Sequence, residues 1–319
     1  MIAAKGERPA KTPKPKMSRA KRVRSIKLFL MVSPFLVLTF IFSYFPLYGW
    51  IYAFHDVRPA LGLAHAEFVG FQWFRMMVNN PVRVQQILNV LRNTFAISGL
   101  GILFSWLPVG FALLLQEVKL TSIKKSIQVL TTLPFYISWV LVFSMAFAIF
   151  AGDGMLNNLL IRWGFIDTPI LFLQSSERVW SSMTAWGIWK GLGWGAIIYL
   201  AAIAGIDQDL YEAARVDGAG RFRLMWHITI PGVIPTFLVL LLLSVASFLN
   251  TGFDQFFMFS NAFNLSRIQV LDLWVYNLGF GGGAFSFATS ISMLRSIVSI
   301  TLLFSINALS KVLRGESII

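Results

Sequence analysis

The sequence has no cysteine and only three histidines, so it offers few of the residues that carry out chemistry. The absence of cysteine from the 319 residues excludes disulfides, thiolate metal sites and catalytic cysteines, and it leaves the redox compartment open. His55, His65 and His227 are too far apart in the sequence to suggest a metal site. The sequence also lacks the P-loop pattern G-x-x-x-x-G-K-[ST] and the H-E-x-x-H, G-x-S-x-G and protein-kinase patterns. It therefore carries no recognisable catalytic or nucleotide-binding motif.

Charge is scarce as well. Only 13% of the residues are charged, against roughly 25% in soluble domains, whereas 56% are hydrophobic and 15% aromatic. This composition indicates an integral membrane protein. The formal net charge of +13 is concentrated in residues 1–27, which hold ten Lys or Arg and one Glu. Because the charge forms a tail and not a binding face, we expect no nucleic-acid partner. We expect residues 1–27 to be a disordered cytoplasmic tail that sets the topology, or alternatively one that binds anionic lipid headgroups.

Long apolar runs dominate the rest of the chain. A membrane-spanning helix needs about 20 mostly apolar residues, and six segments meet this requirement. They are residues 28–54, 93–116, 126–152, 179–206, 232–253 and 285–310. The sequence therefore predicts an all-α integral membrane protein with six transmembrane helices. Between the spans, eighteen Lys and Arg fall on the side of the N-terminus and seven on the other side, which predicts that both termini are cytoplasmic.

One polar stretch, EAARVDGAGRFRLMWHITIPGVIP at residues 212–235, separates the fourth span from the fifth. We predict a short helix that Asp209 caps together with Glu212, in the manner of a capping box. Gly218 and Gly220 should end this helix, since glycine readily adopts the left-handed conformation found at helix ends. A second helix should then present an apolar face, and Pro231 should start the fifth span. From these features alone the stretch is either a docking knob or an ordinary amphipathic re-entry loop.

The stretch strongly resembles the EAA loop of permease subunits of binding-protein-dependent ABC importers, with its pattern E-A-A-x-x-D-G-A. The segments LRNTFAIS, LPFYISWVLV, WKGLGWGAIIYLAAIAGID and FSFATSISMLRSIVSI are similar to those of carbohydrate-uptake permeases of the LplB, UgpA and MalF kind. These permeases belong to importers of polysaccharides or oligosaccharides, for example of the alginate or aldouronate type. The resemblance implies a MetI-like, type I importer fold in the bacterial cytoplasmic (inner) membrane.

The resemblance also implies a division of the chain. The basic tail is followed by the first helix with an outer segment (28–84), the importer transmembrane domain of five helices (85–311) with its coupling loop (207–231), and a cytoplasmic C-terminus (312–319).

In this family the loop is the coupling helix, which fits a groove on a cytoplasmic ATPase. The residues that the resemblance assigns to it are Glu212, Ala213, Ala214, Asp217, Gly218, Ala219, Gly220, Trp226 and Pro231. Glu212 would face an ATPase arginine, and Asp217 would stabilise the glycine corner. Trp226 and Pro231 would tie the loop to the spans.

The implied partners are a second homologous permease, two copies of the ATPase, an extracytoplasmic solute-binding protein and the lipid bilayer. The chain itself would bind no cofactor or metal and would not be an enzyme, because ATP and Mg would be bound by the ATPase.

Polar groups inside spans are costly and usually line a cavity, so they are candidates for the substrate path. The polar candidates are Lys190, Asn250, Asp254, Gln255 and Arg295, and the aromatic ones are Trp189, Trp194 and Tyr199, whose rings could stack on sugars. Lys190 could instead snorkel or pair with Asp254, and Arg295 could form a structural pair or a helix cap. The aromatic residues could belong to an interfacial belt or to packing. Two buried cations would suit an acidic, uronate-containing oligosaccharide.

Two other classes of protein compete with this interpretation. A stand-alone secondary sugar transporter or channel predicts buried acidic residues for ion coupling, and we place none of the fourteen Asp and Glu deep in a span. A membrane-embedded enzyme predicts paired carboxylates or histidines at a membrane face, and the sequence shows no such pair. We therefore expect the permease subunit of an importer. The identity of the saccharide does not follow from the sequence.

Overall fold

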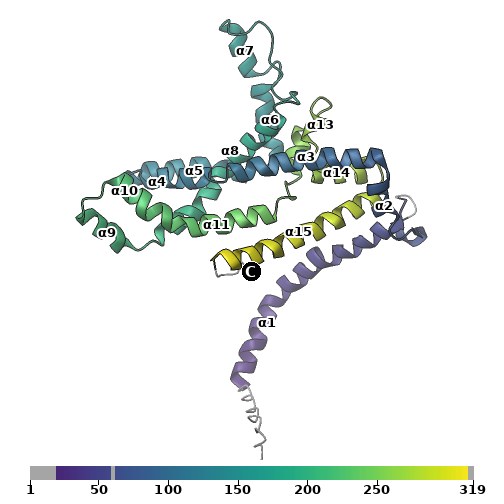
Figure 1. The fold of residues 1–319 in the computed structure, drawn as a ribbon, viewed down its shortest axis with the longest axis horizontal. Helices are drawn as coiled ribbons and strands as arrows, with labels where there is room; N and C mark the ends of the chain where they lie inside the picture. Colours follow the sequence, from purple (N-terminus) through teal and green to yellow (C-terminus); the bar gives the residue numbers. More distant parts are fainter. Residues whose placement is uncertain (1–18, 59–61, 315–319) are drawn as a thin grey trace, which may run out of the picture. The chain divides into compact units, whose positions relative to one another are not determined.

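The computed structural model describes residues 19–58 and 62–314, and the fold is built almost entirely of helices (Figure 1). The chain divides into two units, one up to Ile51 and one from Tyr52. Six helical stretches are long and apolar enough to cross a membrane. They are Val23–Phe54, Pro81–Gln116, Trp139–Arg162, Val179–Ala204, Arg221–Ala246 and Phe285–Ala308. The predicted number of spans is confirmed.

The first unit is one long helical segment that changes from α-helix to π-helix to 3-10 helix along its length. It comprises α1 (Arg19–Thr39), the π-helix η1 (Phe40–Tyr44) and the start of the 3-10 helix η2 (Phe45–Phe54). Pro34 lies inside α1 and cannot donate to the carbonyl of Leu30. The Ser33 hydroxyl donates to that carbonyl at 3.0 Å instead. A neighbouring side chain therefore replaces the hydrogen bond that proline removes.

The structure corrects the predicted extent of the basic tail. Residues 19–27, which the sequence assigned to a disordered segment, form the first turns of α1. Arginine and lysine are good helix formers, so the helix of the apolar run extends back into the basic segment. The remainder of the tail, residues 1–18, lies outside the described residues.

The second unit begins with small elements that pack against the last helix of the chain. A two-stranded antiparallel sheet pairs β1 (His55–Asp56) with β2 (Glu67–Phe68), and the short η3 (Leu63–His65) precedes β2. α2 (Gln72–Asn79) follows, and its Met77 joins a buried cluster with Trp274 and Phe287. The backbone N–H of Val57 donates to the Ser286 hydroxyl at 3.0 Å, which fixes this segment to the start of α15 (Phe285–Arg314).

The second span is longer than predicted and is broken near its middle. α3 (Pro81–Leu103) starts twelve residues before position 93, and α4 (Leu107–Gln116) completes the span. The Asn80 side chain accepts hydrogen bonds from Val82 N at 3.0 Å and Arg83 N at 3.2 Å. This is a regular N-cap with proline at the first helical position, so the polar residues before position 93 are helical too.

The third predicted span, residues 126–152, is wrong as a single helix. The segment divides between α5 (Thr121–Tyr136) and α6 (Trp139–Phe150), and α7 (Met155–Arg162) follows. Ser138 is extended and its hydroxyl caps α6 by accepting from Leu141 N at 3.4 Å. α5 packs against α8 (Val179–Ala204), whereas α6 leads away from it toward α7 (Figure 1). Apolarity is continuous across the break, so hydropathy alone could not locate it.

The remaining helices alternate long spans with short pieces. After α8 come α9 (Gln208–Val216), α10 (Arg221–Leu224), the π-helix η4 (Met225–Thr229) and α11 (Ile230–Ala246). Then follow α12 (Asp254–Phe259), α13 (Leu265–Ile268), α14 (Leu271–Tyr276), the π-helix η5 (Asn277–Gly281) and α15. The short helices from α12 to α14 pack against α3, α6, α8 and α15.

A buried asparagine fastens one of these short helices to α3. Asn93 is 1% exposed, and its Nδ2 donates to the carbonyls of Ser266 at 3.0 Å and Gln269 at 3.1 Å. The hydroxyl of the next residue, Thr94, accepts from Leu271 N at 3.0 Å. The α13 turn is therefore held by side chains of α3, although about 170 residues separate them in sequence.

We expect Asn93→Ala to destabilise the protein by about 1–3 kcal/mol, because two carbonyls of the α13 turn lose a buried donor. Thermal unfolding of the purified protein in detergent measures the effect. Asn89→Ala, one turn earlier on α3, is the control, since Asn89 makes only a 3.5 Å contact with Gln85. Equal unfolding midpoints for the two variants would show that Asn93 does not hold α13.

Candidate functional site

The polar stretch between the fourth and fifth spans forms a short helix, α9, that is capped two residues earlier than expected. The cap is Asp207, whose carboxylate accepts from Asp209 N at 3.0 Å, and not Asp209 with Glu212. The capping-box prediction is therefore wrong. The pattern was ambiguous because two aspartates lie two residues apart, and the chain turns at the first of them.

The corner after α9 is built on Gly218. Its φ of +75° lies in the left-handed region, and Ala219 N donates to the carbonyl of Ala214 at 2.9 Å. Gly218 N also donates to the carbonyl of Arg215 at 3.0 Å. These bonds close α9 in the manner of a Schellman motif, as predicted for this glycine. Gly220 does not end α9 as predicted. Its φ is −74°, and in an extended conformation it is the N-cap of the next helix, α10.

The helix after the corner is continuous up to the end of the fifth span. α10, η4 and α11 follow one another without a break, so the span starts at Arg221 and not at Pro231. The π turn at Met225–Thr229 comes directly before Pro231, which has no N–H to donate and whose ring crowds the carbonyl four residues back. The wider turn accommodates the proline while the helix continues.

The loop exposes an unusual amount of apolar surface. Val216 is 87% exposed, Phe222 83% and Trp226 67%. Glu212 is also exposed, and it has no carboxylate-to-cation pair within 4.0 Å among the described residues. Large uncovered apolar side chains of this kind mark a surface that lipid or another protein covers.

The contacts that tie the loop to the spans differ from those expected. Trp226 and Pro231 are exposed, and neither packs into the core. Instead, the hydroxyls of Tyr211 and Thr229 share a hydrogen bond at 2.9 Å, and Thr229 is 6% exposed. This bond joins α9 to the turn that enters α11. The sequence contained the signal as the single aromatic residue, Tyr211, of this helix.

Lys190, a predicted path residue, is held by the end of α5. Its Nζ donates to the carbonyls of Phe135 at 2.7 Å and Pro134 at 3.1 Å, and it lies 5.4 Å from the centre of the Trp139 ring. The last carbonyls of a helix have no partner within the helix and carry partial negative charge. Lys190 therefore caps α5 at its break from α6, and it does not pair with Asp254.

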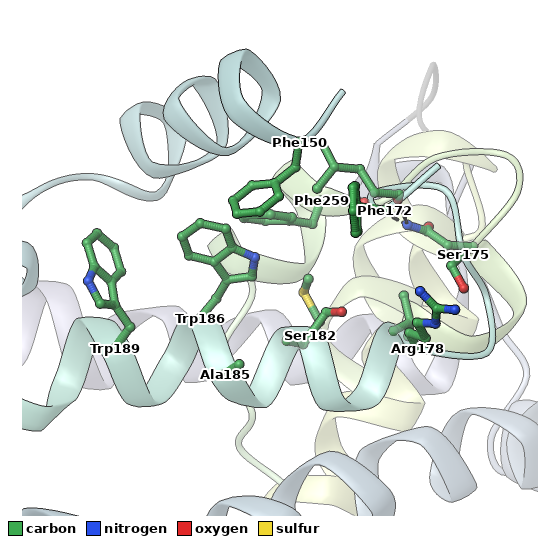
Figure 2. Close-up of a pocket in the computed structure, with 13 residues that line it drawn as sticks. Phe150, Phe172, Ser175, Arg178, Ser182, Ala185, Trp186, Trp189 and Phe259 are labelled. Carbon is green, nitrogen blue, oxygen red and sulfur yellow. Dashed lines mark hydrogen bonds between the residues drawn. The ribbon is translucent and has the colours of Figure 1, made fainter. Parts of the chain in front are cut away.

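Trp189 lines an aromatic cavity of about 370 Å³ between α8, α6 and α12 (Figure 2). Figure 2 shows Trp186 and Trp189 on the same side of α8, with the rings of Phe150, Phe172 and Phe259 opposite. Polar groups at the edge of the cavity come from Ser175, Arg178, Ser182 and Asn264. The sequence analysis missed every one of these residues except Trp189, because α6, α8 and α12 meet only in the fold.

The other two aromatic candidates lie elsewhere. Trp194 stacks on Phe135, with ring centroids 4.6 Å apart and planes at 6°, so the two rings fasten α8 to α5. Tyr199 is 4% exposed in a core cluster with Ala112, Ala196 and Val233. Its ring offers no free face to a sugar, and we leave it out of the proposed path.

Two of the polar candidates line a second cavity, of about 330 Å³, between α3, α8 and the end of α11. Asn250 and Gln255 belong to this cavity together with serines of α3 and of the α11 end. Gln255 Nε2 donates to the carbonyl of Met183 at 2.7 Å. Asp254 does not line the cavity, and it is exposed at the start of α12.

Arg295 forms an internal network. Its guanidinium donates to the carboxylate of Asp272 and to the side-chain carbonyl of Asn250, so α15, α14 and the segment after α11 meet at this arginine. The side chains of Arg295 and Asp272 are 21% and 15% exposed. Asp272 was not recognised from the sequence because it lies between predicted spans. The sequence left open whether Arg295 contacts substrate or forms a structural pair. The structure has the structural pair, with Asp272.

We expect removal of Arg295 alone to cost more than removal of the pair. Arg295→Gln leaves the Asp272 carboxylate uncompensated, which should cost about 2–3 kcal/mol because the pair is partly exposed, less than the roughly 3–5 kcal/mol of a fully buried pair. Asp272→Asn combined with Arg295→Gln should recover at least about 1 kcal/mol of that loss. Thermal unfolding of wild type, both single variants and the double variant gives the coupling energy. Additive effects would mean that the ion pair contributes nothing specific.

Within residues 19–58 and 62–314 no three His, Asp or Glu side chains come close enough to hold a metal ion. The described part of the chain thus presents a helical bundle, a helical loop that exposes charge and apolar surface, and cavities among its spans. These features define a membrane transport subunit. Residues 109–311 match the family of binding-protein-dependent transport system inner membrane components, and the chain belongs to this family.

Curated relatives are similar along nearly the whole chain. The protein LplB of Bacillus subtilis is 40% identical over 286 residues, which cover 89% of this chain and 88% of LplB. The polygalacturonan/rhamnogalacturonan transport system permease protein YteP of the same organism is 35% identical over 310 residues, covering 97% of this chain and 95% of YteP.

A solved structure of a bacterial alginate ABC transporter, in complex with an alginate pentasaccharide-bound periplasmic protein, contains a similar chain. It is 28% identical with a TM-score of 0.80, and the match covers 93% of this chain and 98% of that one. The predicted MetI-like permease fold is confirmed, as are the importer family and the location in the inner membrane. The chain is a transport subunit and not an enzyme. The stand-alone transporter is therefore not supported.

Proposed function

We propose that this chain is one of two permease subunits that together form the membrane path for an oligosaccharide. The observation that carries the proposal is the match of almost the whole chain to permeases named for polysaccharide transport. The alginate transporter was solved with a saccharide-loaded periplasmic protein. By analogy, a solute-binding protein would deliver the sugar to this chain.

The orientation that we propose places both termini and the α9 loop in the cytoplasm. The support is the distribution of Lys and Arg, eighteen on that side and seven on the other. α9 would then be the coupling helix, with Glu212 facing an arginine of the ATPase. Val216 and Phe222 would be covered by the same partner, which explains their exposure. The ATPase pair, with its ATP and Mg, would drive the change of access.

The exposed face of the spans supports a second permease. In the window of Pro81–Gln116 that qualifies as a span, only 6% of the residues are buried. Lipid covers part of such a surface. A homologous permease would cover the rest and complete the path beside the cavity of Asn250 and Gln255.

We propose the aromatic cavity beside α8 as a place where sugar rings stack in the outer half of the path. The ring centroids of Trp186 and Trp189 lie 5.6 Å apart, and the planes of the two rings are at 86°. Together with Phe150 and Phe259 they offer several ring faces. Aromatic faces suit the apolar faces of pyranoses, and a few polar groups at the edge fix orientation. The volume of about 370 Å³ is at the lower end of the range for small-molecule sites.

Purification of the tagged chain from its native membrane tests the proposal. We expect a second permease and an ATPase pair to co-purify, and we expect the liganded binding protein to stimulate ATP hydrolysis by the complex. Recovery of the chain alone, together with sugar uptake that is driven by an ion gradient and independent of ATP, would contradict the proposal.

A further inference from the structure

Two arginines converge on one tryptophan near the start of α8. The guanidinium carbon of Arg92, on α3, lies 5.9 Å from the centre of the Trp180 ring, and that of Arg267, on α13, lies 5.1 Å from it. Both distances are within the range of cation–π attraction. Three helices that are far apart in the sequence therefore bring two cations to a single ring.

The backbone around these arginines is fixed before any ligand arrives. Trp180 Nε1 donates to the carbonyl of Arg267 at 2.9 Å, and Arg267 N donates to the carbonyl of Asn264 at 3.0 Å. The hydrogen bonds from buried Asn93 hold the same turn on its other side. A group held in this way loses little conformational freedom on binding, which favours affinity.

No carboxylate of the described residues balances the positive charge at this position. Among the described residues neither Arg92 nor Arg267 has a carboxylate within 4.0 Å, and the nearby Glu177 forms no ion pair. Two like charges at one ring repel each other, and an anion between them would remove the repulsion. The planar guanidinium fork matches a carboxylate particularly well because it can donate two parallel hydrogen bonds.

The arginine pair lies beside the aromatic cavity. Asn264 lines that cavity and comes three residues before Arg267, while Arg178 lines it and comes two residues before Trp180. The start of α8 and the α13 turn therefore present both aromatic faces and guanidinium groups that have no carboxylate partner among the described residues. This combination fits a sugar ring that carries a carboxylate. By contrast, Lys190 and Arg295, the cations expected from the sequence to contact an acidic sugar, are held by carbonyls and by Asp272.

We propose that Arg92 and Arg267 bind the carboxylates of a uronate-containing oligosaccharide as it enters the aromatic cavity. The inference rests on the proposed function and adds the chemical class of the substrate and the residues that select it. Arg178, at the edge of the cavity, carries a further exposed cation along the same route.

Uptake of two matched probes by the complete transporter tests the inference. The complex is reconstituted in vesicles with its own binding protein and ATP, and it is offered trigalacturonate and the methyl ester of trigalacturonate, in which the carboxylates are neutral. Wild type should take up the free acid faster. The double variant Arg92→Gln, Arg267→Gln should take up the free acid roughly tenfold more slowly, with the rate for the ester unchanged. Arg75→Gln, Arg162→Gln, which removes two exposed arginines elsewhere, should behave as wild type.

Several results would overturn the inference. An equal loss of uptake of the acid and of the ester in the double variant would show that the two arginines do not bind the carboxylates. A rise in the concentration of binding protein that half-saturates ATP hydrolysis would show that they hold an acidic surface of that protein. Uptake of maltotriose with no uptake of either galacturonate probe would exclude the substrate class while leaving ATP-driven sugar import in place.

Discussion

Replacement of Glu212 by arginine should abolish ATP-driven uptake and weaken the association of the ATPase. Glu212 is exposed on α9 and has no partner among the described residues, and it projects from a helix whose neighbouring apolar side chains are uncovered. Reversal of its charge would place two cations opposite each other in the proposed interface. Such a change should cost about 2 kcal/mol or more, roughly a thirtyfold loss of affinity. Co-purification of the ATPase and uptake in vesicles measure both effects.

Glu67→Arg is the matched control for Glu212→Arg. It introduces the same charge change at an exposed glutamate of β2, which forms no ion pair among the described residues and which belongs to neither the proposed interface nor the proposed path. This variant should retain the ATPase and keep ATP-driven uptake. Full uptake and normal subunit association in the Glu212→Arg variant would contradict the assignment of α9 as the coupling helix.

Gly193→Ala should disrupt the packing of α8 on α5. A Cβ at position 193 would lie 2.3 Å from the carbonyl oxygen of Thr131 and 2.4 Å from its carbonyl carbon. Backbone atoms cannot move aside as the end of a side chain can, so the two helices would have to separate. The cost should be about 1–3 kcal/mol or more. A lower unfolding temperature and a lower yield of assembled complex would report it.

Gly191→Ala separates this steric effect from any general effect of glycine replacement. Gly191 lies two residues earlier on the same helix, and a Cβ there would meet no atom within 4 Å. Alanine is the better helix former by about 1 kcal/mol, so this variant should be neutral or slightly stabilised. If the two variants unfolded at the same temperature, close contact between α8 and α5 would not be the reason for Gly193.

The prediction for Gly193 has a consequence for the path as well. The same stretch of α8 carries Lys190, which caps the carbonyls at the end of α5, and Trp194, which stacks on Phe135. Separation of the helices would therefore loosen the break between α5 and α6. Because α6 forms one wall of the aromatic cavity, sugar uptake should fall together with stability in Gly193→Ala.

The sequence alone determined the features that depend on local pattern. Length and apolarity of each run predicted six spans, since crossing a bilayer requires a fixed length of apolar helix. The motif around Glu212 predicted the family, and Gly218 predicted the corner, because a left-handed residue at a helix end favours glycine. Each of these inferences uses residues that are close in the chain.

Only the tertiary structure decided which polar and aromatic side chains meet. The break between α5 and α6 is stabilised by Lys190 from another helix, and Arg295 is paired with Asp272 from α14. The Trp180 arginines come from α3 and α13, which the sequence does not place together. The physical reason is that the charge and the aromatic faces left free for a ligand depend on what each side chain already contacts, and those contacts join residues that are far apart in the sequence.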